Sequence, residues 1–122
     1  MSQDTGDEAE KKWGNTEAYK IAAKRTKSYT STDWKRIKLE SRSIYEGFQK
    51  TRAEPLDSQE VLRWVEQWQQ HIDQYYYPCS DELLLSLAQL YEQDPRYQKN
   101  IDKVGGTGTS NRMIEAIRFH KR

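Results

Sequence analysis

The stretch Tyr75-Tyr76-Tyr77-Pro78-Cys79-Ser80-Asp81-Glu82-Leu83-Leu84-Leu85-Ser86 marks the end of one helix and the start of another. Pro78 ends the first helix, because proline lacks a backbone donor and disfavours helical geometry in the residue before it. Ser80 is a favourable N-cap, and the two carboxylates after it suit the positive end of a helix. The stretch therefore predicts two helices joined by a short turn that holds Cys79.

Apolar residues on both sides of this turn recur at helical spacing. The stripe before the turn consists of Val61, Trp64, Val65, Trp68, Ile72 and Tyr75. Asp57 and Glu60 precede it and form a capping box at the start of the predicted helix. The stripe after the turn consists of Leu83, Leu84, Leu87, Leu90 and Tyr91. Each stripe predicts an amphipathic helix with one face in the core.

The remaining helices are predicted from their cap residues. Asn15 or Thr16 caps a helix to about Thr26, Thr30 and Asp33 form a capping box, Asp94-Pro95 opens a helix to about Lys103, and Thr109 or Ser110 caps the last one. No segment alternates with period two for long enough to form a strand. The predicted fold class is all-α, a small bundle of five to seven helices.

Composition excludes several classes of protein. The 122 residues suit one domain, and 20 basic against 19 acidic residues give no reason to expect strong binding to nucleic acid. No apolar run reaches the roughly 20 residues that span a bilayer. The single cysteine allows no internal disulfide and indicates a reducing, cytoplasmic compartment; with two histidines it makes no plausible zinc set. We expect no metal and no cofactor.

Aromatic residues are frequent for so polar a chain. Apolar residues make up 34% of the sequence, yet it holds four Trp and eight Tyr. Such side chains build a thin core, and they also line ligand pockets because each offers a large rigid surface and, in Tyr and Trp, a polar tip.

Motifs that carry a family resemblance run in order along the chain. They are Trp13-Gly14-Asn15-Thr16-Glu17-Ala18-Tyr19, Tyr29-Thr30 with Asp33-Trp34, Gln70-His71-Ile72, Tyr77-Pro78-Cys79-Ser80, Leu87 with Leu90-Tyr91, Asp94-Pro95-Arg96-Tyr97, Ile101-Asp102 and Ala116-Ile117. With this ordered set the chain resembles the TipAS antibiotic-binding domains, the C-terminal effector domains of MerR-type drug-responsive transcription activators. The resemblance covers roughly residues 10–118.

The resemblance implies a globin-like helical bundle without haem that binds bulky natural-product antibiotics, thiopeptides among them, and is not an enzyme. It implies that N-terminal helices close over the drug, and that the cysteine matching Cys79 adds to a dehydroalanine of the drug in some members, whereas other members bind without a covalent bond. The chain has no winged-helix domain before residue 10, and its segment 104–112 is richer in Gly and Thr than the family pattern.

The domain organisation predicted from sequence and resemblance has two parts. Residues 1–12 form a flexible tail, and residues 13–122 form the ligand-binding domain, within which residues 13–28 are a candidate lid. Residues 1 to about 28 are expected to be less stable than the rest without ligand. The predicted partner is a small-molecule antibiotic, with no contact to nucleic acid or membrane and an isolated domain that is monomeric. The alternative from another class is a protein-interaction or dimerisation module that binds no drug.

The candidate ligand-binding residues combine the motif positions with unassigned aromatics. They are Cys79, Tyr76, Tyr77, Trp13, Tyr19, Tyr29, Trp34 and Tyr91. For several of them a purely structural role remains the alternative to ligand binding. Cys79 could be a packed core residue, Tyr76 or Tyr77 could lie against solvent, and Trp34 could belong to the core. Trp64 and Trp68 are expected in the core, and His71 is expected to be a structural residue bonded to backbone near Pro78.

Overall fold

The computed structural model describes residues 17–122, with side chains from Lys20 onward. This part of the chain forms six helices and no strand, which confirms the all-α class. The helices are α2 (Glu17–Lys27), α3 (Ser31–Lys50), α4 (Gln59–Tyr75), α5 (Asp81–Gln93), α6 (Pro95–Gly105) and α7 (Thr109–Lys121).

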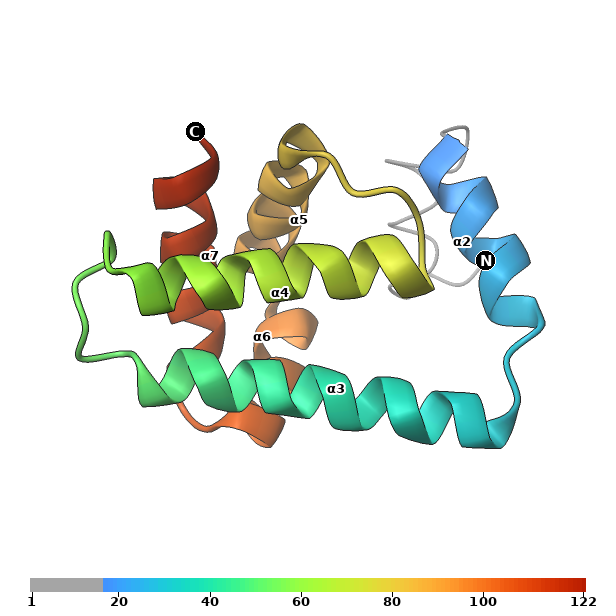
Figure 1. Ribbon diagram of the computed structural model, residues 1–122, viewed down its shortest axis with the longest axis horizontal. Helices are drawn as coiled ribbons and strands as arrows, with labels where there is room; N and C mark the ends of the chain where they lie inside the picture. The colour runs from blue at the N-terminus through green and yellow to red at the C-terminus, as the bar shows by residue number, and fades with distance from the viewer. Residues whose placement is uncertain (1–16) are drawn as a thin grey trace.

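Two pairs of helices make up most of the bundle. The long helices α3 and α4 run antiparallel, side by side, and α5 and α7 pack against each other behind α4 in the view of Figure 1. Helix α6 closes the space between α3 and α7, and α2 lies beside the C-terminal end of α4. The core between the pairs is apolar, and its fully buried side chains include Phe48, Val61, Val65, Leu84, Met113 and Ile117.

A glycine lets α3 and α4 approach closely. Gly47 is buried, and a Cβ atom placed on it would lie 2.2 Å from the ring of Trp64. Arg63 in turn lies 5.7 Å from the Trp64 ring centroid, so its guanidinium covers the ring from outside. The indole therefore sits in a slot that only a residue without a side chain leaves open.

Three of the predicted caps are confirmed. The Thr30 hydroxyl accepts from Asp33 N while the Asp33 carboxylate accepts from Thr30 N, which completes the capping box of α3. Ser80 caps α5 through Leu83 N, at 3.1 Å. Asp94 caps α6 with Pro95 as its first residue. These contacts satisfy backbone donors that a helix start leaves unpaired.

Two predicted caps are wrong. Helix α4 is capped by the Ser58 hydroxyl, which accepts from Val61 N at 3.2 Å, and not by the Asp57–Glu60 pair. Helix α7 begins after Gly108, whose φ of 91° suits glycine and which offers no side chain. The carboxylate of Asp102 on α6 accepts from Ser110 N at 2.8 Å instead. A cap from a distant residue leaves no local sequence signal.

Candidate functional site

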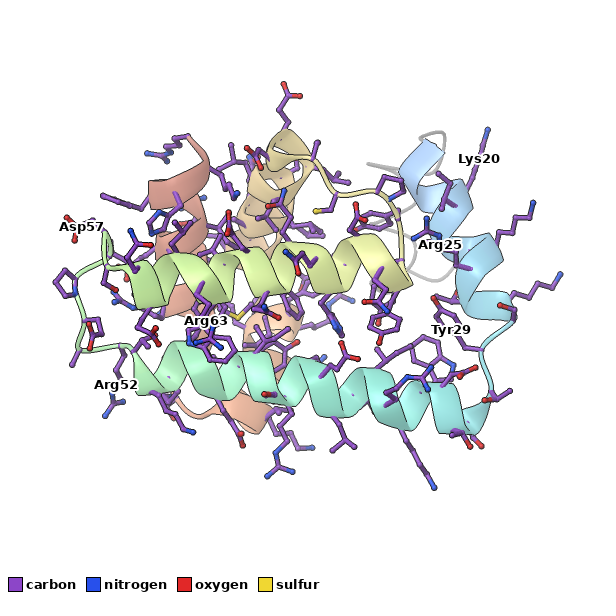
Figure 2. All side chains as sticks on the ribbon, viewed as in Figure 1. Lys20, Arg25, Tyr29, Arg52, Asp57 and Arg63 are labelled. Carbon is purple, nitrogen blue, oxygen red and sulfur yellow. The ribbon has the colours of Figure 1, made fainter. Side chains whose placement is uncertain are left out.

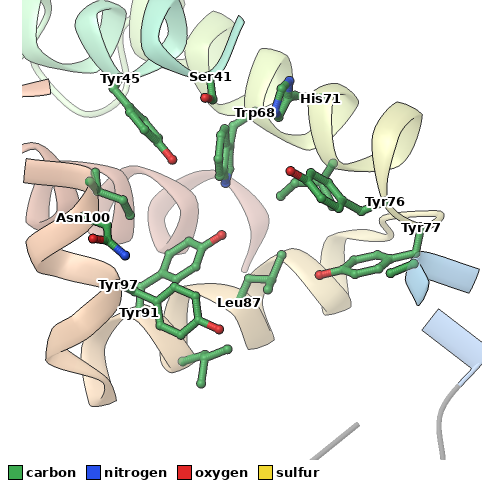
Figure 3. A pocket seen from close by; sticks show the side chains of 14 residues that line it. Ser41, Tyr45, Trp68, His71, Tyr76, Tyr77, Leu87, Tyr91, Tyr97 and Asn100 are labelled. Carbon is green, nitrogen blue, oxygen red and sulfur yellow. The ribbon is translucent and has the colours of Figure 1, made fainter. Parts of the chain in front are cut away.

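An aromatic pocket of about 390 Å³ opens between α3, α4, α5 and α6 (Figure 3). Its wall is mostly apolar and holds polar groups at the tips of rings. The lining residues are Ala22, Ser41, Tyr45, Trp68, His71, Ile72, Tyr76, Tyr77, Leu87, Leu90, Tyr91, Tyr97, Asn100 and Ile101. The volume lies at the small end of the roughly 300–1,000 Å³ range of ligand pockets, so it suits a ring system and not a large molecule as a whole.

The rings of the pocket wall support one another. Trp68 stacks on His71 with centroids 5.4 Å apart and lies 5.3 Å from Tyr45. On the other side, Tyr91 and Tyr97 lie 5.5 Å apart. Packed rings have few rotamers left, so the wall is preorganised for flat, rigid ligands.

Titratable groups of the wall stay neutral near pH 7. Burial raises the pKa of Tyr45 to about 12 and that of Tyr91 well above its usual value. Burial likewise raises the pKa of Tyr77, with a smaller electrostatic contribution from Cys79. Burial lowers the pKa of His71, although the Glu40 carboxylate 3.5 Å from its Nδ1 opposes this. The polar groups of the pocket are therefore the tips of its rings together with the Ser41 hydroxyl and the Asn100 amide.

One donor points into the pocket without an acceptor. Trp68 is 6% exposed, and its Nε1 makes no hydrogen bond within residues 17–122. The indole approaches the Tyr91 hydroxyl closely enough to oppose the rise of its pKa, but not in hydrogen-bond geometry. A buried donor without a partner costs about 1–3 kcal/mol, and an acceptor on a ligand would recover it.

Helix α2 contributes to the pocket through Ala22 and is anchored to the end of α4. The Arg25 guanidinium donates to the carbonyl of Asp73 at 2.7 Å, and the Tyr29 hydroxyl donates to the carbonyl of Tyr75 (Figure 2). The carbonyls at a helix C-terminus carry partial negative charge, which favours a cation there. Few other contacts hold α2, so it is the wall of the pocket with the least support.

The structure brings together some of the candidate residues predicted from sequence. Tyr76, Tyr77 and Tyr91 line the pocket. Trp34 lies behind them, 6.5 Å from the Tyr76 ring, and Tyr29 meets Trp34 edge to face at 5.4 Å. These two residues support the wall and do not line it.

Cys79 lies apart from the aromatic pocket. Its side chain is 8% exposed and lines a separate polar hollow of about 310 Å³ with Glu66, Gln69, Gln70 and Asp73. These α4 residues lie on a different face of the helix from Trp68 and Ile72. Burial, followed by the carboxylates of Asp73 and Asp81, raises the pKa of the thiol to about 12. The thiol is therefore protonated at neutral pH.

Trp13 and the side chain of Tyr19 lie outside the described residues. Conversely, eleven of the fourteen lining residues were not among the candidates predicted from sequence; those with a polar group include Tyr45, Trp68, His71, Tyr97 and Asn100. His71 is buried as expected, but its Nδ1 faces Glu40, and no described hydrogen bond joins it to the turn at Pro78. The Tyr97 position was visible in the motif Asp94-Pro95-Arg96-Tyr97, whereas Asn100 carried no signal.

Within residues 17–122, no cluster of three His, Cys, Asp or Glu side chains could hold a metal ion. No helix among them is long and apolar enough to cross a membrane.

Known proteins are similar in sequence to this chain. It is 35% identical over 113 residues to the HTH-type transcriptional activators TipA of Streptomyces coelicolor and Streptomyces lividans, over 91% of its own length. It is 31% identical over 115 residues to the HTH-type transcriptional activator mta of Bacillus subtilis, over 94% of its length. In each case the match covers 44% of the relative, so the chain spans less than half the length of these activators.

A solved structure shares the fold. TipAS from Streptomyces lividans, in complex with the thiopeptide antibiotic nosiheptide, matches with a TM-score of 0.75 and 30% identity over 94% of this chain and 85% of that one. The family model of the TipAS antibiotic-recognition domain matches residues 6–120. Sequence, helix order and fold agree, and the chain belongs to the family of TipAS antibiotic-recognition domains.

Proposed function

We propose that this chain captures antibiotics by reversible binding of their ring systems in the aromatic pocket, as the sensing part of a transcription regulator or as a free-standing domain. The observation that carries the proposal is the pocket itself, which has a rigid aromatic wall and one unpaired indole donor. A solved structure similar to this chain holds nosiheptide, a thiopeptide antibiotic, and the carbonyls of a peptide are hydrogen-bond acceptors.

The proposed activity is binding without turnover. The tyrosine hydroxyls of the wall have raised pKa values, so they are poor acids near neutral pH. Burial lowers the pKa of His71, which makes its ring a weaker base than a free imidazole. The thiol of Cys79 is protonated near neutral pH and lines another hollow. A covalent adduct at Cys79 stays a prediction of the family resemblance, and it would require a rearrangement that exposes the thiol to the drug.

Titration with nosiheptide and a panel of other bulky antibiotics tests the proposal. A ligand that binds the folded state raises the free energy of unfolding by about 2.7 kcal/mol at a concentration of 100 Kd. We expect a rise in melting temperature and a change in Trp fluorescence for at least one compound. No shift across the panel would overturn the proposal and favour an interaction module.

A single substitution localises the binding. Trp68→Phe keeps an aromatic ring in the wall and removes the indole donor, so we expect affinity to fall about tenfold, the worth of one hydrogen bond to a buried donor. Trp64→Phe is the matched control, because Trp64 lies against Gly47 and not in the pocket. Equal affinities of parent and Trp68→Phe for the antibiotic would place the ligand elsewhere.

The lid hypothesis for α2 predicts uneven protection of backbone amides. In the free protein we expect the amides of α2 to exchange with solvent much faster than those of α4, because α2 is held by few contacts beyond Arg25 and Tyr29. Nosiheptide should slow exchange in α2 more than in α4, since Ala22 faces the ligand space. Hydrogen exchange followed by mass spectrometry measures both. Equal protection of the two helices in the free protein contradicts the hypothesis.

A further inference from the structure

A basic groove runs along α3 and α6 and joins the aromatic pocket. It encloses about 1030 Å³ and is lined by Lys35, Lys38, Leu39, Ser41, Arg42, Tyr45, Asn100, Lys103 and Val104. Ser41, Tyr45 and Asn100 line the aromatic pocket as well. The two spaces therefore lie next to each other and border the same three side chains.

The groove carries positive charge that the described chain does not neutralise. Lys35, Lys38 and Arg42 lie on one face of α3 by helical spacing, and Lys103 faces them from α6. No acidic side chain lines the groove. Arg42 pairs with Glu46 at 3.3 Å on an exposed surface, whereas none of the three lysines has an acidic partner within residues 17–122.

The same groove also exposes apolar surface. Among the described residues, three large apolar side chains stand out as exposed, and two of them line this groove: Leu39 at 67% and Val104 at 45%. Cations interleaved with apolar side chains favour an occupant that is itself amphipathic, with a negative end and an apolar body.

We propose that the aromatic pocket and the basic groove form one site, in which the groove receives the anionic end of a ligand whose rings lie in the pocket. This inference rests on the proposed function and adds the ligand class: aromatic compounds that carry a carboxylate or a sulfonate. Lysine ammonium groups hydrogen-bond such oxyanions, and charge-assisted bonds are stronger than neutral ones. The small volume of the pocket supports it, because a larger antibiotic must continue past Tyr45 and Asn100.

Two fluorescent dyes with almost the same rings test the proposal. Anilinonaphthalene sulfonate is anionic, whereas N-phenylnaphthylamine is neutral and lacks the sulfonate. We expect the sulfonate dye to bind about tenfold more tightly at low salt. Raising the ionic strength should remove most of this advantage, because exposed charges are screened. The dyes should also compete, since their rings share the pocket.

Substitutions of lysines test whether the tighter binding of the sulfonate dye comes from the groove. The double variant Lys38→Gln/Lys103→Gln should bring the affinities of the two dyes to within about threefold and leave the neutral dye unchanged. Lys50→Gln/Lys99→Gln is the control, because it removes the same charge from the same helices at exposed positions outside the groove. The control should keep the tenfold difference.

Four outcomes would overturn the inference: equal affinities of the dyes for the parent, simultaneous binding of both dyes, the same loss in the control, or binding of neither dye. Nosiheptide binding decides the proposed function separately. A protein that binds nosiheptide and the neutral dye but shows no preference for the sulfonate keeps its aromatic pocket and loses the anionic subsite.

Discussion

Iodoacetamide should alkylate Cys79 in the folded protein at least about 30-fold more slowly than in the unfolded chain at pH 7.5. The pKa of the thiol rises from 9.0 to about 12, which lowers the thiolate fraction about 1,000-fold. A thiolate of higher pKa is a stronger nucleophile, and this recovers about 30-fold. Burial of the side chain slows the reaction further. Intact-mass spectrometry against time, in buffer and in urea, measures both rates.

The pH profile fixes the cause of the slow reaction. Since the pKa is raised, the folded rate should climb tenfold per pH unit from 7 to about 11, whereas the unfolded rate should level off near pH 9. A folded rate that levels off near pH 9 would show that Asp73, Asp81 and burial do not act on the thiol as described. Cys79→Ser is the control for labelling at other side chains.

The same measurement bears on covalent capture of a drug. If nosiheptide forms an adduct, it must first bind reversibly and expose the thiol, because the free protein offers almost no thiolate. Cys79→Ala should then abolish the gain in mass and leave reversible affinity. Tight binding without any gain in mass would show that capture is wholly reversible.

Gly47→Val should lower the free energy of unfolding by about 3 kcal/mol, near the upper end of the cost of overfilling a packed core. The first added carbon would already lie 2.2 Å from the Trp64 ring, so α3 and α4 must separate or the indole must leave its slot. For a chain of this size the melting temperature should fall by about 10 °C. Chemical and thermal denaturation followed by circular dichroism measure the loss.

A double-mutant cycle tests the proposed clash. Trp64→Leu makes room beside position 47, so Gly47→Val should cost about 1–2 kcal/mol less in that background. Ser43→Val, at an exposed position of the same helix, should change stability by no more than about 0.5 kcal/mol. If Gly47→Val costs no more than Ser43→Val, the close approach of the helices does not depend on the glycine.

The local sequence predicted the N-cap correctly where the capping residue is adjacent to the helix in sequence. Thr30, Ser80 and Asp94 cap the helices that follow them, and the geometry spans two or three residues. The last helix was predicted to begin at about the right residue, but its cap was not predictable, because Asp102 from another helix accepts the bond from Ser110 N. The error at α4 is different in kind, since Asp57 and Ser58 are both good caps and local sequence does not rank adjacent candidates.

The sequence predicted that an aromatic pocket exists, but not which residues line it. The excess of aromatic residues indicated a cavity wall, and Tyr76, Tyr77 and Tyr91 do line it. Trp68, however, belongs to an apolar stripe of α4, and a stripe has the same spacing whether it faces packed core or an open space. Which rings border a cavity depends on the packing of four other segments, which one helix does not encode.

Because α2 forms part of the pocket wall, the overall affinity for ligands and the selectivity among them depend on different residues. The apparent affinity for any ligand equals the affinity of the closed pocket reduced by the fraction of molecules in which α2 is docked; a docked fraction of about one tenth lowers it tenfold. Arg25 and Tyr29 hold α2 without lining the pocket, so changes there should weaken all ligands by one common factor. Substitutions at Trp68 or Leu87, which line the pocket, should instead change the order of the ligands by affinity. Sensitivity and discrimination can therefore evolve at different positions of this domain.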